Sequence, residues 1–106
     1  MSLLLFKKQF LDPIRTGRKR TTIRRWSRPR VRAGGTAFSP GIGYLEIESV
    51  DPVELTALND HDAAEDGFPD ARQMRRALEK LCNPSQADGK TWFRIRFRLQ
   101  TPAEPA

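Results

Sequence analysis

The chain has 106 residues, of which 30% are charged and 38% hydrophobic, and its formal net charge is +6. This length predicts a single domain over residues 1–100, followed by a disordered tail over residues 101–106. The longest apolar run, residues 3–6, is much shorter than the roughly 20 residues of a membrane span, so we expect no membrane partner and a cytoplasmic location.

The first part of the chain predicts a strand, a helix and a second strand. The apolar residues 3–6 suit a short strand, and residues 7–16 suit one helix that Pro13 kinks or restarts. Gly17 fits the C-terminal cap of this helix. The β-branched residues of 21–25 then predict a strand.

Glycine and proline residues and an alternating pattern predict loops and strands over residues 26–58. Residues 26–35 predict a loop, and residues 36–38 predict a short strand before a Ser-Pro-Gly turn. Residues 44–50 alternate apolar and polar side chains, as a half-buried strand does. Residues 53–58 predict a further extended segment.

The acidic middle of the chain predicts two short helices. Asn59 or Asp60 caps the first helix, which runs to Asp66, and Asp70 caps the second. The second helix has one core face with i, i+4, i+7 spacing, made of Met74, Leu78 and Leu81.

The clearest strand pattern covers residues 92–99. One face is apolar, with Phe93, Ile95, Phe97 and Leu99, and the other carries Arg94, Arg96 and Arg98. These arginines would form a nucleic-acid surface, or they would pair with Glu46 and Glu48 on a neighbouring strand. We favour the ion pairs. The element order predicts an α+β fold, a small mixed β-barrel with flanking short helices.

Charge is distributed unevenly along the chain. Residues 1–32 contain eleven Lys or Arg and the single acid Asp12, whereas residues 33–91 contain eleven acids and five bases. A positive surface beside an acidic one favours an anionic partner. The alternative is a charge distribution that serves only solubility.

One cysteine and one histidine limit the metal and redox chemistry. Cys82 excludes an intrachain disulfide, and Cys82 with His61 supplies too few ligands for a zinc site, which needs three or four. We therefore expect no metal and no cofactor. A Cys–His nucleophile pair is left open as an alternative.

A basic run, GRKRTTIRRW, covers residues 17–26. Thr22 and Arg24 share one face of the predicted strand, and Lys19 lies in the turn before it, from which its side chain reaches toward Thr22. A threonine hydroxyl is a poor nucleophile without a base, and a lysine acts as a base only if burial or nearby positive charge lowers its pKa. The alternatives are a phosphate-binding cluster and a solvated face without function.

Three segments together resemble the ASCH family, whose members are similar in fold to the PUA RNA-binding domain. The run FLDPIRTGRKRTTIRRW resembles the family's N-terminal signature, Gly-(Arg/Lys)-Lys-x-x-Thr-(Ile/Val)-Arg. The run NDHDAAEDGFPDARQMRRAL resembles its acidic-Gly-Phe turn leading into a helix, and TWFRIRFRL resembles its terminal strand. The resemblance covers residues 3–99 and implies a PUA-like barrel.

Some small bacterial members of this family are N4-acetylcytidine amidohydrolases that use a Lys, a Thr and a Glu from these motifs. The resemblance implies Lys19 as base, Thr22 as nucleophile or positioner of water, and Asp66 in place of the Glu, with Glu65 as the neighbouring alternative. In the resulting hypothesis, Arg24 holds the substrate or stabilises the developing oxyanion, and Glu65 and Trp26 are further substrate-binding candidates. Trp26 either stacks on the base or anchors a loop.

The sequence departs from the family pattern at Asp66, at Gly34-Gly35, where many members have Gly-Asp, and at the additional Arg20. The expected reaction is removal of the acyl group from an N4-acylated cytidine nucleoside without a metal, giving cytidine and acetate from N4-acetylcytidine. The expected partner is this small nucleoside or RNA, and the expected assembly is a monomer or weak dimer. The alternative functions are an RNA-binding module and a metal-independent ribonuclease.

Overall fold

The computed structural model of the chain describes residues 2–80 and 89–100. The expected tail, Cys82 and the core position Leu81 lie outside these residues. Within the described part of the chain, no helix has the length and apolar character needed to cross a membrane.

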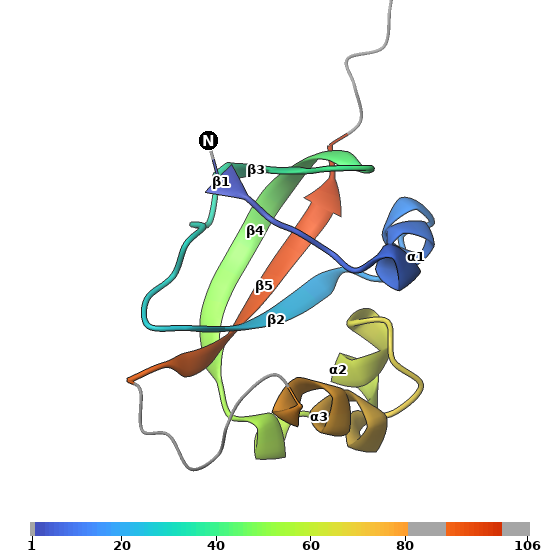
Figure 1. Cartoon of the computed structure of the whole chain (residues 1–106), viewed down its shortest axis with the longest axis vertical. Helices are drawn as coiled ribbons and strands as arrows, with labels where there is room; N and C mark the ends of the chain where they lie inside the picture. The colour runs from blue at the N-terminus through green and yellow to red at the C-terminus, as the bar shows by residue number, and fades with distance from the viewer. Residues whose placement is uncertain (1, 81–88, 101–106) are drawn as a thin grey trace, which may run out of the picture.

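Five strands form one curled sheet that closes about half of a barrel, as Figure 1 shows. The strands are β1 (Ser2–Leu3), β2 (Thr21–Trp26), β3 (Thr36–Ser39), β4 (Gly43–Val53) and β5 (Thr91–Leu99). Their order is β1-β3-β4-β5-β2. β1 is parallel to β3, and the other neighbours are antiparallel. With a few short helices beside this sheet, the predicted α+β class is confirmed.

The two faces of the sheet bury two separate clusters. On the inner face, Phe93, Ile95 and Phe97 of β5 pack with Leu45, Ile47 and other apolar residues, as their alternation predicts. On the outer face, Ile23 of β2 packs with Leu58, Ala63, Met74 and Leu78. Leu99, which was expected inside, is 37% exposed because it ends the strand.

The predicted single helix over residues 7–16 is wrong, because two short helices occupy this segment. A 3-10 helix, η1 (Lys8–Phe10), is followed by α1 (Leu11–Arg15). Pro13 lies in the first turn of α1, where a missing backbone N–H costs no helical hydrogen bond. Gly17 follows with a φ of 81°, as its expected capping role requires.

Two capped helices, α2 (Asp60–Glu65) and α3 (Ala71–Glu79), cover the outer face near β2. Asn59 caps α2 in a reciprocal capping box with Asp62, and Asp70 caps α3. Both helices therefore start where the sequence predicts. The expected extended segment over residues 53–58 is wrong in its second half, because residues 55–57 form the 3-10 helix η2 (Leu55–Ala57).

The pairing of β4 with β5 contains an irregularity. Ile47 lies opposite Phe97 and Ser49 lies opposite Arg96, so the register shifts at Glu48. The predicted cross-strand ion pair is confirmed for Arg98 and Glu46, where Nη2 of Arg98 lies 2.8 Å from Oε2 of Glu46. It is wrong for the other two arginines: Arg94 pairs with Asp62, and Arg96 pairs with Glu65, on α2.

Candidate active site

A cleft of about 210 Å³ lies along the edge of the sheet that β2 forms. One wall is formed by the N-terminal residues Leu5, Phe6, Lys7, Gln9 and Phe10. The other wall is the turn after α2 together with α3. Four of the residues that line the cleft were predicted from the sequence as site residues, namely Lys19, Thr22, Arg24 and Asp66. Phe6, Phe10 and Phe68 give the cleft an aromatic lining.

Main-chain hydrogen bonds fix the position of Lys19 on both sides. The N–H groups of Arg18 and Lys19 both donate to the carbonyl of Pro13, each at 2.9 Å. The next N–H, from Arg20, donates to the carbonyl of Glu65 at 2.6 Å. The backbone of Lys19 is thus held between the end of α1 and the end of α2.

The side chain of Lys19 is only 3% exposed. Its ammonium group donates to the main-chain carbonyl of Asp66 at 2.6 Å and lies 3.5 Å from the carboxylate Oδ2 of Asp66. Burial lowers the pKa of Lys19 to about 8, although Asp66 opposes this shift. The charged form also lies 4.6 Å from the ring centre of Phe10.

Asp66 is a buried carboxylate, 2% exposed, at the C-terminal end of α2. Burial raises its pKa, and Lys19 together with a hydrogen bond from Thr21 opposes that rise. The hydroxyl of Thr21 donates to Oδ1 of Asp66 at 2.9 Å. Thr21 was not among the predicted site residues, because the strand alternation places it on the face opposite Thr22 and nothing in the sequence shows that Asp66 packs there.

The guanidinium group of Arg24 is held by hydrogen bonds to other residues of the chain. Its Nε donates to the hydroxyl oxygen of Thr22 at 2.9 Å, and its Nη2 donates to the carbonyl of Leu5 at 2.6 Å. Its guanidinium group also lies 5.0 Å from the ring centre of Phe6. A fixed positive charge beside the Thr22 oxygen favours the alkoxide form of this hydroxyl.

Two of the predicted site residues lie elsewhere. Trp26 packs against Phe93, with ring centres 6.4 Å apart, so its contacts are those of a core anchor. The carboxylate of Glu65 points toward β5 and accepts two hydrogen bonds from Arg96, at 2.8 and 2.9 Å. Neither residue lines the cleft. Among residues 2–80 and 89–100, no group of three or more His, Cys, Asp or Glu is close enough to hold a metal ion.

No family model matches the chain, and no curated protein matches it. Among solved structures, the chain is similar to the crystal structure of protein EF3133 from Enterococcus faecalis V583, which is described by the family model DUF984. The TM-score is 0.61 with 11% sequence identity, and the match covers 93% of this chain and 80% of that one. At this identity the similarity concerns the fold alone.

Proposed function

We propose that the protein is an amidohydrolase that removes the acetyl group from N4-acetylcytidine, and that its half-barrel is of the PUA-like type. The observation that carries the proposal is the buried ammonium group of Lys19, held by Asp66 in a cleft that also contains Thr22. A lysine with a pKa of about 8 is available as a base near neutral pH.

The reaction uses these groups in two proton transfers. Neutral Lys19 accepts a proton from the Thr22 hydroxyl or from a water that Thr22 positions, and the oxygen attacks the acetyl carbon. Arg24 stabilises the charge that develops at the Thr22 side of the cleft. When the bond between the acetyl carbon and N4 breaks, Lys19 returns the proton to N4 and cytidine leaves. If Thr22 is the nucleophile, water then releases acetate from it.

The shape of the cleft suits a small planar substrate. A volume of about 210 Å³ is below the roughly 300–1,000 Å³ of drug-sized pockets, so it suits a base with its acyl group rather than a whole nucleotide. The rings of Phe6, Phe10 and Phe68 offer faces and edges for a pyrimidine. The sugar would then lie at the mouth, where Lys7 and Gln9 are exposed.

The direct test is incubation of the purified protein with N4-acetylcytidine and chromatographic detection of cytidine and acetate. Equimolar release of both products supports the proposal. Incubation with N4-acetylcytosine in parallel shows whether the sugar is needed. No release of cytidine at enzyme concentrations close to that of the substrate rejects the proposed reaction.

We expect kcat/KM to rise with pH through an apparent pKa of about 8. Burial lowers the pKa of Lys19 to this value, and only its neutral form accepts a proton, so the active fraction grows as pH increases. The measurement is a pH–rate profile from pH 6 to 10 with N4-acetylcytidine. A profile that is flat across this range contradicts Lys19 as the base.

RNA binding is the second candidate, and the exposed arginines of the loop between β2 and β3 favour it. Arg28, Arg30 and Arg32 are exposed, and no acidic residue occurs between Asp12 and Glu46. Two of these arginines line a separate hollow of about 590 Å³ beside β1. The buried side chain of Val31 fixes this loop. Two main-chain hydrogen bonds also hold it: the N–H of Gly34 donates to the carbonyl of Ile47, and the N–H of Ile47 donates to the carbonyl of Gly35.

We expect replacement of Arg28, Arg30 and Arg32 by Ala to weaken binding of single-stranded RNA. If all three contact phosphates, the slope of log K against log salt falls by about 2, because each contact contributes about 0.7. Fluorescence anisotropy at several salt concentrations measures this slope. The same titration, followed by gel analysis, shows whether RNA is cut. An unchanged slope would show that the arginines of this loop do not contact RNA phosphates.

A further inference from the structure

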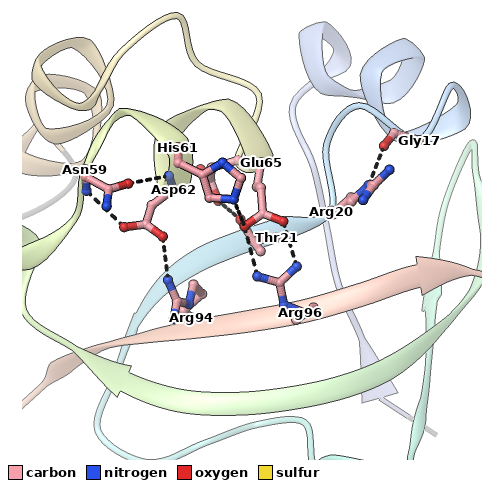
Figure 2. A network of polar contacts seen from close by, with 10 residues as sticks. Gly17, Arg20, Thr21, Asn59, His61, Asp62, Glu65, Arg94 and Arg96 are labelled. Atoms are coloured by element: carbon pink, nitrogen blue, oxygen red, sulfur yellow. Dashed lines mark hydrogen bonds and ion pairs between the residues drawn. The ribbon is translucent and has the colours of Figure 1, made fainter.

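Two ion pairs dock α2 onto the arginine face of β5, and Figure 2 shows them side by side. Asp62 and Glu65 are three residues apart on the helix, and Arg94 and Arg96 are two residues apart on the strand. Nη1 of Arg94 lies 3.1 Å from Oδ1 of Asp62, and Arg96 binds Glu65 through both of its terminal nitrogens. We call these the Arg94 pair and the Arg96 pair.

The Arg96 pair is the stronger of the two. A guanidinium that meets a carboxylate through two parallel hydrogen bonds fixes orientation as well as distance. The side chain of Glu65 is 17% exposed, so the pair is partly shielded from water. His61 lies 3.7 Å from Glu65, but it is 82% exposed and contributes little.

The Arg96 pair sits directly beside Asp66. Glu65 precedes Asp66 in the chain, and its carbonyl also accepts the N–H of Arg20, the residue after Lys19. Arg96 lies opposite Thr21 in the sheet, and Thr21 is the residue that donates to Asp66. Glu65 and Asp66 therefore leave the end of α2 in different directions, one toward β5 and the other toward Lys19.

We propose that Arg96 and Glu65 are positioning residues that set the orientation of the last turn of α2 and so hold Asp66 against Lys19. The expected effect on turnover rests on the proposed function. The expected effect on the contact between Lys19 and Asp66 does not depend on it. The Arg94 pair joins the same helix and strand one turn earlier. It serves as the matched control because Asp62 meets Asp66 only through a helical main-chain hydrogen bond, from the Asp66 N–H to the Asp62 carbonyl, and does not precede it in the chain as Glu65 does.

The first experiment measures the coupling between Lys19 and Asp66. NMR of protein labelled with 13C at the lysine ε carbon gives the pKa of Lys19, whose signal is identified by its loss in Lys19→Met. Because Asp66 raises this pKa, Asp66→Asn lowers it, and the decrease measures the coupling. We expect the decrease to be at least halved in an Arg96→Gln background and to be unchanged in an Arg94→Gln background.

The second experiment measures turnover of N4-acetylcytidine. We expect Arg96→Gln to lower kcat about 10- to 100-fold with KM changed less than about 3-fold, because a shift of about 1 Å in a catalytic group has effects of this size. Arg94→Gln should stay within about 3-fold of the wild type. If the wild type itself shows no turnover, the proposed function fails, whereas the NMR result still decides whether Arg96 positions Asp66.

Arg96→Lys provides a second variant if Arg96→Gln does not fold. It keeps the charge but loses the two-bond geometry, so the coupling should again fall. Equal coupling in the Arg96 variants and in the wild type overturns the proposal. The same holds if Arg94→Gln reduces the coupling as much as Arg96→Gln does, because the effect would then come from helix docking in general.

Discussion

Lys19→Met is expected to lower kcat/KM for N4-acetylcytidine by about 10³-fold or more while the domain remains folded. General base catalysis contributes roughly 10²–10⁴-fold, and methionine fills a similar volume without a proton acceptor of comparable strength. The substitution leaves Asp66 without its cationic partner, so its pKa rises further, because burial raises this pKa and Lys19 opposes the rise. The hydrogen bond from Thr21 to Asp66 remains available. Steady-state kinetics with circular dichroism as the folding check measures both outcomes.

Lys8→Met is the matched control for this substitution, because Lys8 is exposed on η1 and does not line the cleft. It should leave kcat/KM within about 2-fold of the wild type. Lys19→Ala is a more severe companion variant, since it opens space beside Asp66. Activity near the wild-type level in a folded Lys19→Met protein would refute the proposed mechanism.

Asp66→Asn is expected to lower kcat about 10²-fold and also to shift the pH–rate profile toward lower pH. The amide keeps the size of the side chain but supplies no negative charge to orient the Lys19 ammonium. Because Asp66 raises the pKa of Lys19 and burial lowers it, the loss of Asp66 moves this pKa below about 8. The base is therefore neutral at lower pH, yet it is poorly oriented.

Asp66→Asn should also destabilise the fold, since breaking one partner of a buried pair costs about 3–5 kcal/mol. Urea unfolding at pH 7 measures this cost. Asp70→Asn changes another helix-associated aspartate and is the control, because Asp70 caps α3 and does not line the cleft. An Asp66→Asn enzyme whose profile stays centred at about 8 would show that the Asp66 carboxylate does not raise the pKa of Lys19.

The other four strands and the starts of α2 and α3 could be predicted because their signals are local, whereas the strand expected over residues 3–6 is limited to Ser2–Leu3. The alternation of Phe93, Ile95 and Phe97 identifies β5, and the side chains of Asn59 and Asp70 mark where helices begin. Residues 7–16 divide between Phe10 and Leu11, where the 3-10 helix η1 ends and α1 begins, and not at Pro13. The residue spacing in this segment does not indicate this boundary.

The candidate site could be predicted only in part. Lys19, Thr22, Arg24 and Asp66 line one cleft, but Glu65 and Trp26 do not. The contribution of Thr21 and the engagement of Arg24 with Thr22 and Leu5 depend on how the sheet curls and on where α2 packs. These are relations between segments distant in the chain, and a single sequence does not specify them.

The irregular pairing at Glu48 determines which carboxylate lies within hydrogen-bonding distance of Arg96. With regular pairing after Ile47 and Phe97, Glu48 would be the residue facing Arg96 across the strands, and two acids would compete for one guanidinium. The extra residue in β4 instead places Ser49 there. Arg96 pairs with Glu65, and Glu48 adds only a weaker electrostatic attraction. A change in the length of β4 at this point would thus change the carboxylate that faces Arg96, so the cleft depends on the number of residues in β4 as well as on the residues that line it.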